Sequence, residues 1–259
     1  MSLPVVELFP ALQGEGNRMG VPSFFVRLGG CNLTCSGFGC IQKSPITNEE
    51  LSGCDSIHAV NAKHFKHEWD HYDDFNELVS DIEDNMIYED RYGHKPDIVI
   101  TGGEPMIHHK DDVMINMIEY FHSRGHEIHI ETNGTIPVDF DVFDVYRNVH
   151  FTMSVKMSAS GEPINKRWRS EVVNEYLRNT KDSIFKFVLS EESLEKEAEE
   201  VLDFLKQVPT YAKVYCMPLG GTKEEVQENA KDVYEFALNN SFNYSDRLHI
   251  RIYDDMKLV

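Results

Sequence analysis

Four of the five cysteines lie close together in the first part of the chain, with a spacing that suits a metal centre. Cys31, Cys35 and Cys40 fall in one short stretch, Cys54 follows after a polar insert, and Cys216 stands far from the others. Thiolates are soft ligands that select zinc or iron–sulfur clusters, and a cluster needs three or four of them. In a reducing compartment, an odd and tightly spaced set indicates a metal site rather than a disulfide framework. Cys31 and Cys35 are therefore predicted ligands with Cys40 or Cys54 as the third, and Cys216 is explained as a buried structural thiol.

Two further segments could take part in chemistry. TGGEP (101–105) follows an apolar run, and its two glycines allow the backbone to approach a ligand closely. Residues 36–72 are polar and carry no long periodic pattern, and loops of this length inside a compact domain tend to be functional. The histidines of this loop could bind zinc together with Cys40, although a solvated polar insert explains them as well; they are His58, His64, His67 and His71.

Apolar, β-branched segments alternate with amphipathic ones along most of the chain. The predicted strands are 4–9, 23–28, 97–101, 126–131, 149–154, 184–189, 212–216 and 247–252. The predicted helices lie near 109–123, 163–178, 191–207 and 222–239, the third beginning at Ser190 or Glu191 and the fourth capped by Thr222 and Glu225. Such alternation predicts crossover units and a mostly parallel sheet covered by helices. Without an internal repeat or linker, residues 1–259 are expected to form a single α/β domain. The cysteines would then lie at the carboxyl edge of its sheet, where parallel folds place their sites.

The charge of the chain limits its partners. Its formal net charge is −19, which repels nucleic-acid phosphates and anionic membrane surfaces. No apolar run is long enough to span a bilayer, and the N-terminus lacks the pattern of a signal peptide. We therefore expect a cytoplasmic protein that binds neither nucleic acid nor membrane.

Several motifs together resemble the 7-carboxy-7-deazaguanine synthase family of radical S-adenosylmethionine (SAM) enzymes. They are LQGEG (12–16), PSFFVRLGGCNL (22–33), GCDSIHAV (53–60), TGGEP (101–105), ETNGT (131–135) and SVK (154–156). Radical SAM enzymes usually space their cysteines as C-x3-C-x2-C, which neither Cys40 nor Cys54 reproduces, but members of this family tolerate an insert. GCDSIHAV is similar to the segment that begins at the family's third cluster cysteine. The resemblance thus implies a 4Fe–4S cluster on Cys31, Cys35 and Cys54, an insert at about 36–53, and one iron left open to chelate SAM.

The resemblance also implies positions for the ligands. SAM is expected at Gly53, Cys54, Asp55, Gly103, Ser154, Val155, Lys156, Cys216, Met217, Pro218 and Leu219. In this set Val155 replaces a proline of the family's motif. The substrate 6-carboxy-tetrahydropterin is expected at Leu12, Gln13, Gly14, Arg27, Thr101 and Val259. Within that second set, the Arg27 guanidinium would pair with the substrate carboxylate. The Ser56 hydroxyl takes the position of a threonine that binds Mg²⁺, a cation that prefers oxygen ligands.

The C-terminal segment RLHIRIYDDMKLV (247–259) matches the family's ending in length but departs from it in sequence. Arg251, Tyr253 and Asp254 stand where the family has glutamine, histidine and lysine. The expected contacts to the pterin therefore stay open at this end of the chain, and with them the substrate itself.

As a whole, the resemblance implies an incomplete parallel (β/α) barrel of the radical SAM type. Its reaction would be ring contraction of the pterin to 7-carboxy-7-deazaguanine with loss of ammonia, in queuosine or another deazapurine pathway. It also implies a homodimer that receives electrons from a donor such as flavodoxin. Two alternatives remain. Another radical SAM enzyme, such as a glycyl-radical activase, would share the cysteines and TGGEP but would not need LQGEG or Arg27. A non-catalytic iron–sulfur or zinc protein would leave TGGEP, SVK and Ser56 without a purpose.

Overall fold

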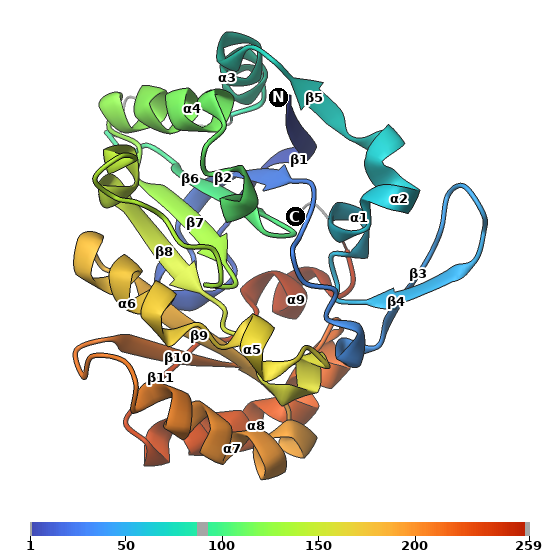
Figure 1. Ribbon diagram of the computed structural model, residues 1–259. Helices are drawn as coiled ribbons and strands as arrows, with labels where there is room; N and C mark the ends of the chain where they lie inside the picture. The colour runs from blue at the N-terminus through green and yellow to red at the C-terminus, as the bar shows by residue number, and fades with distance from the viewer. Residues whose placement is uncertain (1, 87–92, 257–259) are drawn as a thin grey trace.

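The computed structural model describes residues 2–86 and 93–256, and within them the chain forms an open barrel of mostly parallel strands (Figure 1). The nine strands of the main sheet follow the order β11-β10-β9-β8-β7-β6-β2-β1-β5. Their bounds are β1 (Leu3–Leu12), β2 (Pro22–Leu28), β5 (Asp70–Tyr72), β6 (Asp97–Gly102), β7 (Ile128–Thr132), β8 (Val149–Met153), β9 (Ile184–Leu189), β10 (Lys213–Pro218) and β11 (Asn243–Tyr244). From β2 to β11 all neighbouring strands are parallel, whereas β1 is antiparallel to β2 and to β5. This confirms the predicted α/β class and its incomplete parallel barrel.

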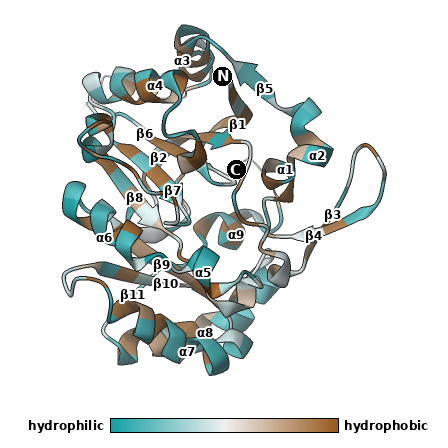
Figure 2. Cartoon of the chain, in the orientation of Figure 1, coloured by the Kyte–Doolittle hydropathy of each residue, from teal (hydrophilic) through white to brown (hydrophobic). Residues whose placement is uncertain are grey.

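Helices cover the outside of the sheet, and the apolar core lies between the two layers. The longer ones are α3 (Phe75–Asn85), α4 (Asp112–Ser123), α6 (Ser170–Asn179), α7 (Glu191–Leu205) and α8 (Lys223–Asn239). Apolar residues concentrate on the strands, whereas the helices are apolar on one side and polar on the other (Figure 2). On α4, Met114, Met117 and Ile118 are fully buried in this core. The carboxyl ends of the parallel strands are thereby fixed against a rigid layer.

Local signals fix where the helices begin. Ser190 and Ser193 form a reciprocal capping box at the start of α7, and Thr222 and Glu225 form one at the start of α8, as predicted for the latter pair. The predicted helix 163–178 is instead divided into α5 (Ile164–Arg167) and α6, with an extended Trp168 between them.

The side chains at this break explain the division. Arg167 is buried and donates from Nε to the Glu162 carbonyl at 3.0 Å, while the Trp168 ring packs against Phe204. Adjacent residues of one regular helix point in directions about 100° apart. The helix therefore ends where both side chains must be accommodated in the interior.

Two predictions of local structure were wrong. Residues 247–252 were expected as a strand, but they form helix α9 (Leu248–Tyr253), which lies within the curve of the sheet (Figure 1). Its position is set by distant contacts, since Leu248 N donates to Gly14 O at 2.9 Å. The segment 36–72 was expected as a long loop, yet it contains several short regular elements. They are the hairpin β3 (Cys40–Lys43) and β4 (Glu50–Gly53), the helices α1 (Ile57–Val60) and α2 (Ala62–Phe65), and strand β5.

These elements form because the segment has a small apolar cluster of its own. Ile57, Phe65 and Trp69 are buried together and contact Val6 and Leu51. The hairpin β3–β4 projects away from the barrel (Figure 1). Within the described part of the chain, no helix is long and apolar enough to cross a membrane.

Candidate active site

The three cysteines assigned to the cluster lie near one another beyond the end of β2. Cys31 and Cys54 line one cavity of about 280 Å³, together with Thr34, Gly53 and other residues. Burial, together with the nearby Glu104, Cys35 and Cys54, raises the pKa of the Cys31 thiol to about 12. Burial likewise raises the pKa of Cys35 to about 11, with Cys54 again contributing. The three thiols are thus close enough to oppose each other's ionisation, and the positive charge of bound iron would relieve this repulsion.

Cys40 is placed differently from these three. It is exposed on β3, opposite Gly53 of β4, whereas Cys35 is buried and Cys31 and Cys54 are partly buried. Burial raises its pKa, and so do the charges of Asp55 and Cys54, whereas Cys31 and Cys35 are not among the main influences. The arrangement fits a cluster held by Cys31, Cys35 and Cys54 better than one held by Cys40.

The loop that carries Cys35 is held in a strained conformation by a distant carboxylate. Cys35 has a φ of 48° and a ψ of 43°, the left-handed region that costs a non-glycine residue free energy. One oxygen of Glu162 accepts from Thr34 N at 2.6 Å, from Thr34 Oγ1 at 2.8 Å and from Cys35 N at 2.9 Å. Burial alone would raise the pKa of Glu162, but these donors outweigh it and lower the pKa. Sequence reasoning missed Glu162, because nothing near it in the chain indicates a partner so far away.

We expect that Glu162→Ala loosens this loop, whereas Glu162→Gln largely preserves it. Alanine leaves two backbone N–H groups without their charged acceptor, which costs about 2–3 kcal/mol of stability. Glutamine keeps a carbonyl oxygen at the same position. Urea unfolding and the iron bound per chain after anaerobic reconstitution measure both effects. Equal iron content in the alanine variant and the wild type would contradict this role.

Three strand-end loops are joined beside the cysteines. Gly103 N donates to Leu28 O at 3.2 Å and Glu104 N to Gly30 O at 2.9 Å, and a side chain at Gly103 would overlap the Gly30 carbonyl. TGGEP therefore packs directly on the cysteine loop. Glu104 is fully buried and accepts from Asn133 N at 2.6 Å.

The ETNGT segment is built into the same scaffold. Thr132 Oγ1 donates to Glu104 at 2.7 Å, and Asn133 Nδ2 donates to Asn32 Oδ1 at 2.9 Å. Asn32 in turn donates from Nδ2 to Thr135 Oγ1 at 2.8 Å. These contacts hold ETNGT as a structural turn that joins the cysteine loop to β7.

The two remaining SAM segments divide between site and core. Lys156 Nζ donates to Ser154 Oγ at 3.1 Å and lies over the Phe38 ring, and its charge lowers the pKa of Cys35. Val155, the replacement for proline, is buried in the apolar core. In β10, Cys216 and Met217 are also fully buried, whereas Leu219, which directly follows the strand, is partly exposed.

A second group of predicted residues lies on adjacent strands, at one level inside the barrel. Strand register places Glu7 opposite Arg27, Arg27 opposite Thr101, and β7 next to β6. Arg27 Nε pairs with Glu7 at 2.5 Å, and Thr101 Oγ1 donates to Glu131 Oε2 at 2.9 Å. Burial would raise the pKa of Glu7, but His58 and Arg27 lower it to about 2. The guanidinium of Arg27 is therefore oriented through Nε by a charged neighbour.

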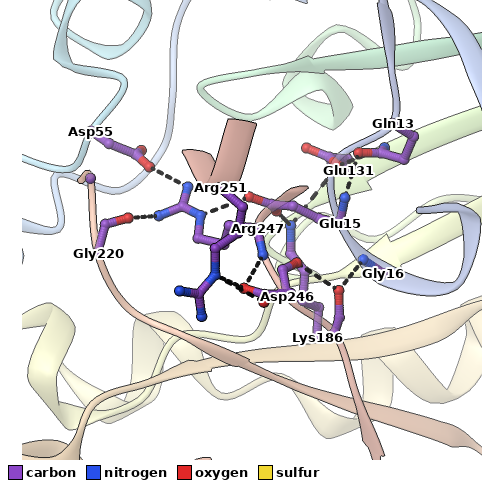
Figure 3. A network of polar contacts seen from close by, with 12 residues as sticks. Gln13, Glu15, Gly16, Asp55, Glu131, Lys186, Gly220, Asp246, Arg247 and Arg251 are labelled. Atoms are coloured by element: carbon purple, nitrogen blue, oxygen red, sulfur yellow. Dashed lines mark hydrogen bonds and ion pairs between the residues drawn. The ribbon is translucent and has the colours of Figure 1, made fainter. Parts of the chain in front are cut away.

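A buried charge network continues this level toward the C-terminal helix (Figure 3). Lys186 Nζ lies 2.6 Å from Glu15 and 3.9 Å from Glu131, while Arg247 Nε lies 3.1 Å from Glu15. Burial would raise the pKa of Glu15, but Lys186 and Arg247 outweigh it and hold the pKa far below its usual value. Gln13 Nε2 also donates to Glu131 Oε1 at 3.4 Å.

The network was only partly visible in the sequence. Glu15 belongs to the motif LQGEG, but the sequence predicted no functional role for it, nor for Glu131, Lys186 and Arg247. A lone lysine inside the apolar strand IFKFVL was the available signal, because an unpaired lysine is rarely buried.

Two metal predictions can be compared with these side chains. No group of three or more His, Cys, Asp or Glu residues that could hold a metal ion occurs in the described ranges. The zinc hypothesis is not supported, since His58 contacts Glu7 and His64 contacts Ser44 and Glu49. A cluster of four irons is larger than one ion and spaces its cysteines more widely, so the cysteine arrangement still fits it. Ser56 Oγ donates to Asp55 at 3.2 Å, and Mg²⁺ there would need oxygens from water or substrate.

Val259, which was predicted to contact the substrate, lies outside the described residues.

Known proteins are similar to this chain in sequence and in fold. A family model described as a 4Fe-4S single cluster domain matches residues 12–177. The 7-carboxy-7-deazaguanine synthase of Hyperthermus butylicus is 30% identical, covering 96% of this chain and 92% of its own. The enzyme of that name from Halobacterium salinarum is 27% identical over 98% of this chain and 91% of its own. The crystal structure of QueE from Escherichia coli matches with a TM-score of 0.63 and 22% identity, covering 96% and 95% of the two chains, which supports the fold. The chain belongs to the 7-carboxy-7-deazaguanine synthase family and to the 4Fe–4S single cluster domain family, and it is a radical SAM enzyme.

Proposed function

We propose that this enzyme converts 6-carboxy-5,6,7,8-tetrahydropterin to 7-carboxy-7-deazaguanine with loss of ammonia. The observation that carries the proposal is a layer of polar side chains inside the barrel, called the polar level here. It is formed by Arg27, Thr101, Glu131, Glu15 and Lys186, and it lies inside the barrel whose strand ends carry the cysteines. Its charged groups are enclosed, which suits a small polar molecule with a carboxylate better than a protein chain. A glycyl-radical activase would need access for a protein segment.

Residues of this chain would hold the two cofactors at the strand ends. Cys31, Cys35 and Cys54 would bind the 4Fe–4S cluster, and its open iron would chelate SAM. The TGGEP backbone and the SVK segment, through Ser154 and Lys156, would contact SAM beside it. When bound, the pair supplies one-electron cleavage of SAM and, with it, abstraction of a hydrogen atom from the substrate. The protein contributes orientation and exclusion of water.

The polar level would hold the pterin. Arg27, oriented by Glu7, would pair through its free guanidinium nitrogens with the substrate carboxylate. Thr101, Gln13 and the backbone of Leu12 and Gly14 would contact the ring. We extend the proposal to Mg²⁺ at Ser56 and to a contact of the Val259 carboxylate with substrate. It also includes a homodimer, a flavodoxin-type electron donor and a cytoplasmic location.

Anaerobic turnover tests this function. The reconstituted enzyme, given SAM, dithionite and the pterin, is expected to form 7-carboxy-7-deazaguanine and ammonia in equal amounts, as measured by mass spectrometry and an ammonia assay. A matched reaction without SAM should form neither. If the enzyme cleaves SAM but the pterin remains unchanged, the assignment to this substrate is wrong.

A further inference from the structure

The three atypical residues of the C-terminal helix are engaged with other parts of the chain or exposed. Arg251 Nε donates to Asp246 at 3.0 Å and 3.1 Å, and its Nη1 donates to Gln227 at 2.7 Å. Asp254 accepts from Lys223 N at 2.8 Å, which ties the end of α9 to the start of α8. Tyr253 is 45% exposed. These are the positions where the family's ending has glutamine, histidine and lysine, so none of them supplies those groups to the site.

A different side chain of α9 faces the site. Leu248 N donates to Gly14 O at 2.9 Å, and a side chain at Gly14 would overlap the imidazole of His249. The helix thus packs so closely on LQGEG that only glycine fits beneath the ring. His249 is partly buried, and Glu15, Glu131, Arg247 and Lys186 lie close enough to influence its pKa. It lies between the C-terminal helix and the loop that carries Gln13 and Gly14.

We propose that His249 contacts the pterin directly and replaces the polar groups that Arg251, Tyr253 and Asp254 do not provide. The inference rests on the proposed function, because it specifies one contact of that same substrate. Its geometric basis is the imidazole that sits against Gly14 at the end of the buried charge network.

The chemistry of the ring suits such a contact. Burial lowers the pKa of His249, with Glu15 opposing this effect, so the imidazole is largely neutral at pH 7. A neutral imidazole has one donor and one acceptor nitrogen. The edge of a pterin alternates donors and acceptors, and no hydrogen bond within the described residues occupies either ring nitrogen of His249. The ring can therefore bind the substrate without first breaking a bond to the protein.

Kinetics of three variants test the contact. In His249→Phe, which keeps a ring but no polar atom, we expect the KM for the pterin to rise about tenfold, the size of one or two lost hydrogen bonds. The KM for SAM should stay at the wild-type value. His249→Gln keeps a donor and an acceptor and should restore part of the affinity. The matched control is Tyr253→Phe on the same helix, which should leave both KM values unchanged.

The outcomes separate this inference from the proposed function. Anaerobic calorimetry measures pterin binding independently of turnover and should show the same tenfold loss for His249→Phe. Wild-type pterin affinity in His249→Phe, or an equal loss of pterin affinity in Tyr253→Phe, would overturn the contact. Turnover of the pterin by the wild type would still uphold the proposed function. If His249→Phe fails to fold, the pterin affinity of His249→Gln decides instead. A rise in the KM values for both the pterin and SAM would show that His249 has a structural role only and would overturn the contact. A wild type that leaves the pterin unchanged overturns both proposals.

Discussion

Cys54→Ala is expected to abolish the brown colour of the reconstituted enzyme and its absorbance at about 400 nm, whereas Cys40→Ala is expected to keep both. Cys54 shares a cavity with Cys31, and its charge raises the pKa of both Cys31 and Cys35. Loss of this thiol leaves two ligands, which are too few for a stable cluster. Cys40 is exposed and is not among the main influences on the pKa of Cys31 or Cys35, so its loss should remove no cluster ligand.

This pair of variants is informative because the two cysteines are close neighbours. Cys40 pairs with Gly53 across the β3–β4 hairpin, and Gly53 directly precedes Cys54 in the chain. Both substitutions therefore change neighbouring positions of the same segment, and iron and sulfide content per chain isolates the ligand effect. Full iron content in Cys54→Ala together with loss of iron in Cys40→Ala would reverse the assignment.

Lys186→Met should have the largest effect on stability, about 3 kcal/mol, because it removes the cation that buried Glu15 shares with the partly exposed Glu131 and leaves Glu15 with Arg247 alone. The Lys186 side chain is only 7% exposed. Although burial lowers the pKa of Lys186, Glu131 and Glu15 raise it above its usual value, so the amine is charged at neutral pH. Urea unfolding of the enzyme before reconstitution measures the loss.

A surface pair provides the matched control for this variant. Lys206 lies 2.7 Å from Asp203, but both side chains are largely exposed, and water screens their interaction. Lys206→Met should leave the unfolding midpoint unchanged. The pH dependence gives a second test, since the folded-state pKa of Glu15 is lowered. Its stabilising contribution is present above the unfolded pKa near 4.5 and is lost as the pH falls toward the folded value. Equal stability of Lys186→Met and the wild type would contradict a strong buried pair.

Elements with a local cause could be predicted from the sequence. The buried strands from β6 to β10 are runs of apolar, β-branched residues between turns, and Thr222 with Glu225 caps α8 as expected. Helix α9 could not be predicted in this way. The sequence RLHIRI alternates with a period of two, but Arg247 pairs with Glu15 and Leu248 bonds to Gly14, both more than 200 residues earlier in the chain. Tertiary contacts of this kind override local propensity.

The same distinction applies to the site. The cysteines and TGGEP occur in contiguous motifs, so the residue types and the resemblance of these motifs to a known family carried the prediction. Glu162 and Lys186 act through partners more than 100 residues away, Thr34 for the first and Glu15 for the second. A single sequence contains no signal for such pairs beyond an unusual charge in an apolar strand.

Hydrogen transfer from the substrate is the most direct test of the account, which places the pterin within reach of SAM at the strand ends. The measurement uses 6-carboxy-tetrahydropterin with deuterium at C6 and follows the mass of the 5′-deoxyadenosine that the enzyme releases. We predict deuterium in the 5′-deoxyadenosine that is released. Because ring contraction with loss of ammonia alone is redox-neutral, the abstracted hydrogen must otherwise return to the product radical, so less 5′-deoxyadenosine than deazaguanine should be released. If 5′-deoxyadenosine forms without deuterium while the labelled pterin is consumed, the hydrogen comes from another position, and the proposed arrangement of substrate and SAM is wrong.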